Sequence, residues 1–189
     1  MDGQAKAFLD IGGKSLLQRV IDRLRPQAKR LLLSVESESS VYSRFGLPQI
    51  ADPEPGHGGP LGGLWVALRE AERGGDEWLL LAPCDAPFLP PDLADRLLEC
   101  ALSQQCPGAL IRLGDEAQPT FSVWHTSLLS ALEQAVTEQN MAGFKQFLAT
   151  RPLAMLEWPV AQESAFLNIN DKAALDEARR IYHEGQESC

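Results

Sequence analysis

Apolar residues recur along the chain at two spacings, and segments of the two kinds alternate. Helical spacing predicts helices over 15–27, 41–45, 61–73, 91–104, 127–138, 143–150 and 171–183. Short apolar runs predict strands over 31–35, 49–51, 78–82, 109–111, 120–124 and 154–158. The run 78–82 is apolar on both faces, which is typical of a central parallel strand. Alternating strands and helices predict βαβ units in an α/β fold with a mostly parallel sheet.

The length and composition indicate a single domain over residues 1–189. No apolar run approaches the ~20 residues needed to span a bilayer. The amino terminus has no basic stretch followed by an apolar one, so we expect a cytoplasmic protein. Cysteines at 84, 100, 106 and 189 form no Cys-x-x-Cys pair, and no histidine stands at finger spacing. We therefore expect reduced thiols and no zinc site.

The net charge is −9, which argues against a duplex nucleic-acid partner because such proteins usually present a basic face. A small anionic ligand would need a local site of backbone N–H groups, a lysine or a metal ion. The carboxyl ends of the strands are the place to look, because open α/β sheets bind ligands there.

Asp85 is the best candidate for chemistry, because it directly follows the strand predicted over 78–82. Pro83 and Pro87 restrict the backbone on either side of it. A carboxylate at the sheet edge could hold Mg²⁺ together with phosphate oxygens. A turn or helix-cap aspartate is the alternative that its position leaves open.

Three other segments are weaker candidates. Lys6 could place a positive charge on phosphates, although a solvated surface lysine is the commoner case. The loop 52–63 holds Gly56, Gly58, Gly59, Gly62 and Gly63, and the helix after it would aim N–H groups at a ligand. His57 in this loop is more often a solvent-exposed residue than a ligand or base.

Asn168-Ile169-Asn170 precedes the last predicted helix. Asn170 or Asp171 is a natural N-cap for that helix. Two asparagines around one apolar residue would also point to the same side of an extended segment, where donor and acceptor together suit the edge of a heterocycle. Capping and recognition are compatible.

Motifs of other enzyme classes are missing. The sequence has no Gly-x-Ser-x-Gly, so a hydrolase triad has no support. Gly12-Gly13-Lys14-Ser15 does not complete a phosphate-binding loop, because Phe8 stands where the first glycine is required.

Taken in order, these segments resemble the molybdenum-cofactor guanylyltransferases, and the resemblance runs through nearly the whole chain. Residues 1–6 resemble the end of the family's Arg-Met-Gly-x-x-Lys loop, and 12–16 resemble the segment leading into its first helix. Gly59-Pro60-Leu61-Gly62-Gly63 matches Gly-Pro-Leu-x-Gly. The specific motifs are Pro83-Cys84-Asp85-Ala86-Pro87, which matches Pro-Cys-Asp-x-Pro, and Asn168-Ile169-Asn170; Gln118-Pro119-Thr120 matches a further motif.

The resemblance implies a Rossmann-like nucleotidyltransferase fold with three layers and a set of residue roles. Asp85 would bind Mg²⁺, and Lys6 would contact the triphosphate. Nucleotide contacts would come from Ser34, Asp52, Gly59 and Pro60, and pterin contacts from Asn168 and Asn170. GMP would pass from GTP to the terminal phosphate of molybdenum-bearing molybdopterin, releasing pyrophosphate. Partners would be these small molecules, with molybdoenzymes or cofactor-delivery proteins downstream, no nucleic acid and no membrane, and the protein would be a monomer or a weak oligomer.

The resemblance departs from the family at the amino terminus. The family opens with a strand and Leu-Ala-Gly-Gly, whereas this sequence begins at the methionine of the Arg-Met-Gly segment. Asp2 stands where the family has glycine, and Ala5 where many members have aspartate. We therefore expect the first strand and most of the phosphate loop to be missing, through a start codon placed too late or through a shortened, inactive relative. Exposed strand edges and apolar faces would then make the chain poorly soluble or weak in GTP binding.

Two alternatives stay open. One is a nucleotidyltransferase of the same fold that uses CTP or a sugar phosphate. The other is a non-catalytic molybdopterin-binding relative that has lost the nucleotide side and hands the cofactor to a molybdoenzyme. Cys84 beside Asp85 and the Asn168-Ile169-Asn170 motif favour the molybdenum branch, and Asp85 with Lys6 favours catalysis.

Overall fold

The computed structural model describes residues 6–53 and 59–187, and the side chains of 185–187 are not described. The α-helices are α1 Leu16–Leu24, α2 Pro60–Arg73, α3 Leu93–Ser103, α4 Leu129–Thr137, α5 Phe144–Thr150 and α6 Lys172–Glu187. The 3-10 turns are η1 Lys6–Phe8, η2 Ser40–Phe45, η3 Thr126–Leu128 and η4 Val160–Phe166. The strands are β1 Asp10–Ile11, β2 Lys14–Ser15, β3 Leu33–Val35, β4 Gln49–Ala51, β5 Trp78–Leu81, β6 Gly108–Leu113, β7 Glu116–His125 and β8 Ala154–Trp158.

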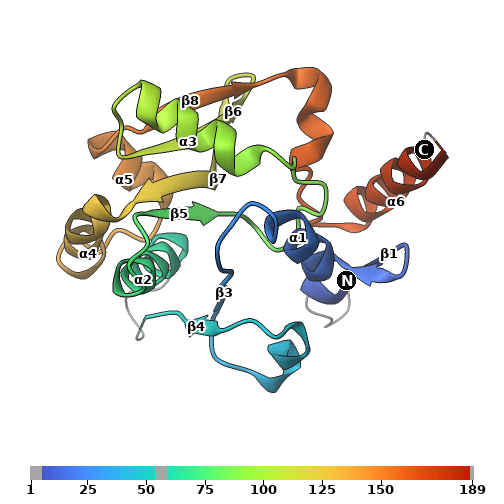
Figure 1. Cartoon of the computed structure of the whole chain (residues 1–189), viewed down its shortest axis with the longest axis horizontal. Coiled ribbons are helices and arrows are strands. Elements are labelled where there is room, and N and C mark those ends of the chain that lie inside the picture. The colour runs from blue at the N-terminus through green and yellow to red at the C-terminus, as the bar shows by residue number, and fades with distance from the viewer. Residues whose placement is uncertain (1–5, 54–58, 188–189) are drawn as a thin grey trace.

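The strands form a four-stranded sheet and two separate pairs. The four-stranded order is β5-β7-β6-β8, in which β6 and β8 are parallel and β7 is antiparallel to both neighbours. Strands β3 and β4 form a parallel pair, and β1 and β2 an antiparallel hairpin. Figure 1 shows β3 and β4 set apart from the larger sheet. The α/β class is confirmed, and the sheets are mixed rather than mostly parallel.

The direction of β7 has a simple cause in the chain. Only Gly114 and Asp115 separate β6 from β7, and Gly114 has a φ of +55°. A parallel pair needs a crossover of about a dozen or more residues, whereas two residues suffice for an antiparallel hairpin. Strand β5 consequently pairs with an antiparallel neighbour and ends the sheet, which corrects the expectation that 78–82 is a central parallel strand.

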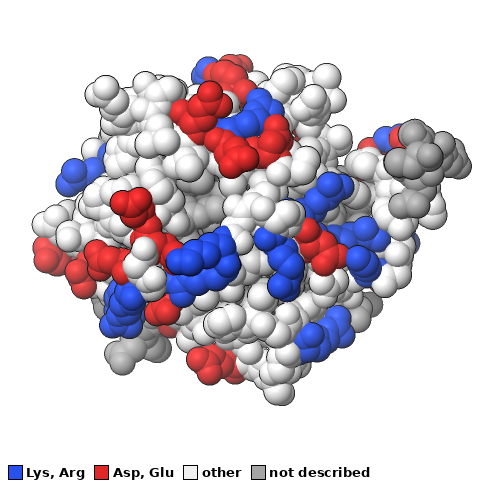
Figure 2. Space-filling view, viewed as in Figure 1, with Lys and Arg blue, Asp and Glu red and all other residues white. Residues whose placement is uncertain are grey.

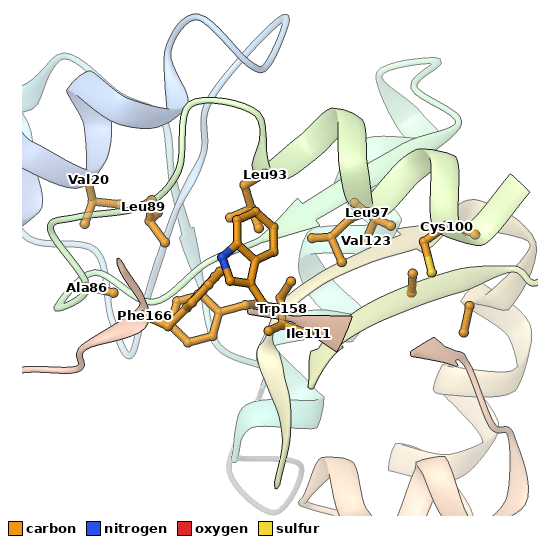
Figure 3. Packing of buried hydrophobic residues seen from close by; sticks show 14 residues of the cluster. Val20, Ala86, Leu89, Leu93, Leu97, Cys100, Ile111, Val123, Trp158 and Phe166 are labelled. Atoms are coloured by element: carbon orange, nitrogen blue, oxygen red, sulfur yellow. The ribbon is translucent and has the colours of Figure 1, made fainter. Parts of the chain in front are cut away.

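Helices cover both faces of the four-stranded sheet and give three layers. On one face α3 packs through Leu93 and Leu97 onto Phe121 and Val123 of β7. Figure 3 shows this cluster, with Trp158 and Phe166 at its centre. On the other face α2, α4 and α5 surround Trp124, which is fully buried. Alternate residues of β7 therefore enter different cores.

Replacement of Trp124 by alanine is expected to lower the free energy of unfolding by about 3–5 kcal/mol, the usual loss for a large buried aromatic. Its ring lies near Phe144 and Phe147, and its Nε1 donates to Ser122 Oγ at 2.7 Å. Urea unfolding would measure the change. Val41→Ala is the control, because Val41 is 53% exposed and its loss should change stability by less than about 0.5 kcal/mol.

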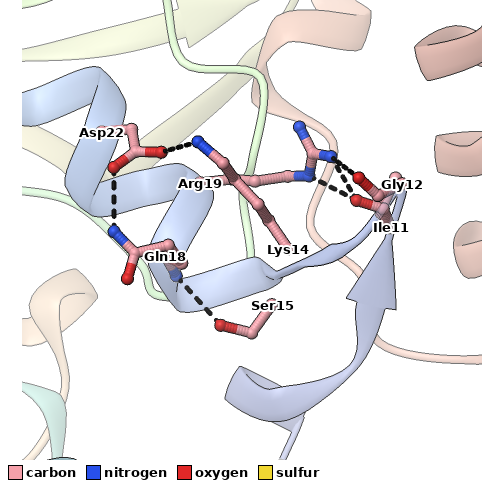
Figure 4. A network of polar contacts seen from close by, with 7 residues as sticks. All are labelled: Ile11, Gly12, Lys14, Ser15, Gln18, Arg19 and Asp22. Atoms are coloured by element: carbon pink, nitrogen blue, oxygen red, sulfur yellow. Dashed lines mark hydrogen bonds and ion pairs between the residues drawn. The ribbon is translucent and has the colours of Figure 1, made fainter. Parts of the chain in front are cut away.

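The residues before α1 form a hairpin that periodicity alone does not reveal. Strands β1 and β2 meet at a turn in which Gly12 and Gly13 have φ of +57° and +79°, as a two-residue hairpin requires. Figure 4 shows Arg19 of α1 donating to the carbonyls of Ile11 and Gly12. Ser15 caps α1, and its Oγ accepts from the N–H of Gln18 at 3.3 Å. The hairpin is thereby fixed to α1, and it holds the preceding η1 in place.

Charged side chains of both signs are interspersed on the face seen in Figure 2. Close pairs include Arg30–Asp76 and Lys14–Asp22, each at 2.6 Å. Exposed pairs of this kind are worth at most about 1 kcal/mol, so they place loops more than they stabilise the fold. Within the described residues, no helix is both long and apolar enough to cross a membrane.

Candidate active site

Asp85 lies four residues beyond the end of β5, in a turn that is rooted in the core. Ala86 and Leu89 after it are fully buried, whereas the Asp85 side chain is half-buried. Its carbonyl accepts a hydrogen bond from the N–H of Ile169 at 3.0 Å. The turn that carries Asp85 is therefore fixed against the segment 168–170.

Burial raises the pKa of Asp85 above its ordinary value, because the carboxylate has lost part of its hydration. A backbone hydrogen bond and the positive charge of Lys6 offset part of this rise. The carboxylate therefore favours a nearby cation. Within the described residues no three His, Cys, Asp or Glu side chains converge as a metal cage. A single carboxylate suits Mg²⁺ that is shared with substrate phosphates, because Mg²⁺ there takes one or two carboxylates and completes its shell with phosphate oxygens and water.

Lys6 lies beside the same turn. Its ammonium donates to Oδ1 of Asn170 at 2.7 Å, and it is close enough to Asp85 to lower the pKa of that carboxyl. The side chain is exposed, so it can exchange the amide for a phosphate oxygen. Lys14, the other lysine of this region, pairs with Asp22 instead.

The segment Asn168–Asn170 is extended and anchored by Ile169, which is fully buried. Oδ1 of Asn168 is buried and has no hydrogen-bond partner among the described residues, a costly state for a polar atom. The N-cap of α6 is Asp171, whose Oδ1 accepts from the N–H of Ala174 at 2.8 Å. Asp171 therefore caps α6, and the side-chain amides of Asn168 and Asn170 are not used for capping.

A second group gathers where β3 and β4 end. Ser34 is exposed on β3, and Asp52 directly follows β4. A Cβ added at Gly63 of α2 would lie 3.3 Å from Oδ1 of Asp52 and 3.4 Å from Oγ of Ser34, so these three residues face one space. Burial first, and the charge of Glu36 second, raise the pKa of Asp52. Glu36 was missed from the sequence, although it follows strand 31–35 just as Asp85 follows strand 78–82.

Gly59 and Pro60 form the start of α2. Gly59 has a φ of +92°, and a Cβ there would lie 2.9 Å from the carbonyl oxygen of Ala142, so only glycine fits without strain. The first N–H groups of α2 are already used: Leu61 donates to Ala142, and Gly62 and Gly63 donate to Gly59. This corrects the expectation that the helix aims free N–H groups at a ligand. Gly56, Gly58 and His57 lie outside the described residues, as do residues 1–5.

The two groups are linked through one cavity. Lys6, Asp85 and the asparagine pair are joined by the contacts above, and Ser34 belongs with Asp52 and Gly63. Ser34 and Cys84, the neighbour of Asp85, line the same cavity between β3 and β5. Cys84, Cys100 and Cys106 are free thiols, as expected, and Cys189 lies outside the described residues.

The α/β fold places the carboxylate of Asp85 near the ammonium of Lys6, an arrangement suited to the phosphates of a nucleotide and a metal ion shared with them. The solved structures that share this fold include the two that follow. Molybdopterin-guanine dinucleotide biosynthesis protein A from Archaeoglobus fulgidus has a TM-score of 0.78 and 22% identity over 96% of this chain and 92% of its own. The 2-C-methyl-D-erythritol 4-phosphate cytidylyltransferase of Thermus thermophilus has a TM-score of 0.71 and 19% identity over 94% of each chain.

The family is shown by sequence. The model of the MobA-like NTP transferase domain matches residues 1–155, and the chain belongs to this family. A molybdenum cofactor guanylyltransferase from Rhodopseudomonas palustris (strain BisB5) is 39% identical over 186 residues, which cover 96% of this chain and 87% of the relative. The resemblance drawn from the motifs is confirmed, and the protein is a nucleotidyltransferase.

Proposed function

We propose that this protein transfers GMP from GTP to the terminal phosphate of molybdenum-bearing molybdopterin in a Mg²⁺-dependent reaction, acting as one domain over residues 1–189. The observation that supports it best is the cluster of Lys6, Asp85, Asn168 and Asn170, which brings a lysine, a half-buried carboxylate and two asparagine amides to one place. The relative that is 39% identical bears the name of this activity.

The residues suit an in-line displacement at phosphorus. An oxygen of the acceptor phosphate forms a bond to the α-phosphorus of GTP, and the bond from that phosphorus to the pyrophosphate oxygen breaks. The substrate supplies its own nucleophile, so the protein needs no activated serine or cysteine. Catalysis then rests on positioning and on neutralising charge. Asp85 would hold Mg²⁺, which neutralises phosphate charge, and Lys6 would bind the triphosphate.

Each substrate would be bound by one of the two groups of residues described above. Ser34, Asp52, Gly59 and Pro60 would contact the nucleotide, and Gly63 leaves room for it between Ser34 and Asp52. On the pterin side, Oδ1 of Asn168 is a buried acceptor that no described residue satisfies, which suits an N–H of a heterocycle. Asn170 is held by Lys6 until the substrates arrive.

Calorimetry with GTP, CTP and ATP, with and without Mg²⁺, tests the nucleotide half of this proposal on the chain and on Asp85→Ala. We expect binding selective for GTP that weakens without Mg²⁺ and in the variant. Pyrophosphate release that depends on added molybdenum-molybdopterin tests the transfer. Tighter binding of CTP than of GTP would indicate that the protein transfers a cytidylyl group rather than a guanylyl group. Pterin binding by a folded chain that ignores all three nucleotides would indicate a non-catalytic binding protein.

Gly63→Ala is expected to weaken GTP binding by about tenfold or more, because the new methyl group enters the space between Asp52 and Ser34. The same change should preserve or slightly raise stability, because alanine is favoured over glycine inside a helix by about 0.5–1 kcal/mol. Gly143→Ala is the matched control, because a Cβ there meets nothing within 4 Å. Equal GTP affinity in the two variants would show that Gly63 does not contribute to the nucleotide site.

A further inference from the structure

A hydrogen bond joins the lysine that we expect to bind the triphosphate to an asparagine that we expect to bind the pterin. The ammonium of Lys6 donates to Oδ1 of Asn170 at 2.7 Å, across 164 positions of the sequence. In the ligand-free protein this bond therefore occupies a donor of the first side chain and the acceptor of the second. Both groups are ones that the substrates need.

The backbones that carry the two side chains are both fixed. The carbonyl of Lys6 accepts from the N–H of Leu9 at 3.0 Å. Next to Asn170, Ile169 is fully buried and donates its N–H to the carbonyl of Asp85 at 3.0 Å. Lys6 and Asn170 are themselves exposed. An exchange of hydrogen-bond partners therefore needs only side-chain rotation and leaves the backbone in place.

Contacts further along α6 hold this helix against the amino-terminal hairpin. The ring of Tyr182 packs so closely on Gly12 that a Cβ there would clash with it. The guanidinium of Arg19 lies 4.3 Å from the centre of the same ring and donates to the carbonyl of Gly12 at 3.3 Å. Figure 1 shows α6 beside the β1 hairpin. These contacts keep the two segments together when the bond between Lys6 and Asn170 breaks.

A triphosphate is a stronger partner for Lys6 than Asn170 is. The amide oxygen is neutral, whereas a phosphate oxygen carries negative charge and attracts the ammonium more strongly. Once Lys6 leaves, Oδ1 of Asn170 is an open acceptor. Two positions earlier, Oδ1 of Asn168 is satisfied by no described residue. Two amide oxygens are then available to the N–H groups of a heterocycle.

We propose that the bond between Lys6 and Asn170 is a latch between the two substrate sites, which GTP opens and the pterin substrate uses in its open state. The triphosphate takes the ammonium of Lys6, and the freed Oδ1 of Asn170 accepts from the pterin. GTP therefore tightens binding of the pterin, and by thermodynamic reciprocity the pterin tightens binding of GTP by the same factor. The latch rests on the proposed function, because it assigns one substrate to each residue.

Calorimetry with GTP and Mg²⁺ tests the latch on the full chain and two alanine variants. Asn170→Ala removes the competing partner of Lys6, so we expect it to tighten GTP binding by about threefold to tenfold, the range of one hydrogen bond. Asn168→Ala is the matched control, because the amide oxygen that it removes is not bonded to Lys6, and GTP affinity should stay the same. Unchanged or weaker GTP binding by Asn170→Ala would overturn the latch, and weaker binding would show that Asn170 orients Lys6 for the phosphate.

A second background shows whether the effect passes through the ammonium. Lys6→Met combined with Asn170→Ala should bind GTP no more tightly than Lys6→Met alone, because no ammonium is left to release. Tightening of equal size in both backgrounds would overturn the inference.

The coupling itself is measured with molybdenum-bearing molybdopterin and a GTP analogue that has a methylene group between its α- and β-phosphates, so that transfer does not occur. Saturating analogue should tighten pterin binding by about fivefold in the starting protein and leave it unchanged in Lys6→Met. Equal pterin affinity with and without the analogue, in a chain that binds both ligands, would overturn the latch and leave the proposed function standing. Absence of any GTP binding by the folded chain would overturn the proposed function, and the latch with it.

Discussion

Asp85→Asn is expected to lower kcat on the order of 10³-fold while leaving the fold intact. The carboxylate is the group placed to hold Mg²⁺, and an uncharged amide of the same shape neither binds the ion tightly nor offsets its charge. Steady-state pyrophosphate release at saturating GTP measures the loss. Activity within a factor of about three of the starting protein would remove Asp85 from the catalytic centre.

The same substitution is expected to raise the stability of the ligand-free protein at neutral pH. The pKa of Asp85 is raised in the folded state, so the folded protein binds this proton more tightly than the unfolded chain does. The proton on Asp85 therefore favours folding at low pH. This contribution is lost as pH rises through the raised pKa that Asp85 has in the folded protein. Asparagine has no such dependence.

Urea unfolding across pH separates these two effects. Asp85→Asn should exceed the starting protein in stability near pH 7, and the difference should vanish below the ordinary carboxyl pKa of about 3.9, where both side chains are neutral. Asp22→Asn is the control with the opposite sign, because Lys14 lowers the pKa of Asp22. A loss of activity together with a loss of stability at neutral pH would indicate misfolding rather than removal of a metal ligand.

The spacing of apolar residues predicted most helices and strands, because whether such an element forms depends largely on residues that are neighbours in the sequence. Strand β8 matches the predicted 154–158, and the helix predicted over 41–45 lies within the 3-10 turn η2. Element boundaries were less predictable: α3 begins at Leu93, two residues later than predicted. The β1–β2 hairpin was not predicted, because two-residue strands are too short for a periodic pattern and depend on contacts of Arg19 and Tyr182 with Gly12.

The candidate site was predictable only as separate pieces. The position after a strand identified Asp85 and Asp52, and their motifs gave the family. No pattern along the chain brings Lys6 to Asn170, which are 164 residues apart, or leaves Asn168 with an unpartnered oxygen. These contacts arise because the hairpin is fixed to α1 and Ile169 is anchored in the core, so they follow from packing rather than from local sequence.

Lys6→Met should raise the KM for GTP by about tenfold or more, and it should also change the pH dependence of activity. Methionine keeps much of the length of the side chain and removes the charge that binds the triphosphate. Lys6 also lowers the pKa of Asp85, so without it that pKa rises further. Protonated Asp85 holds Mg²⁺ poorly, and the acidic limb of the kcat/KM profile should therefore move to higher pH.

Two variants distinguish this role from a structural one. Lys6→Arg keeps the positive charge and should return the acidic limb toward its original position, even if the KM is only partly restored. Lys14→Met removes a lysine whose partner is Asp22, and it should leave both the KM and the limb unchanged. If Lys6→Met raised the KM without moving the limb, Lys6 would bind phosphate without acting on Asp85. If it moved neither, Lys6 would serve only to hold Asn170, and the positive charge that the transfer requires would have to come from elsewhere in the site.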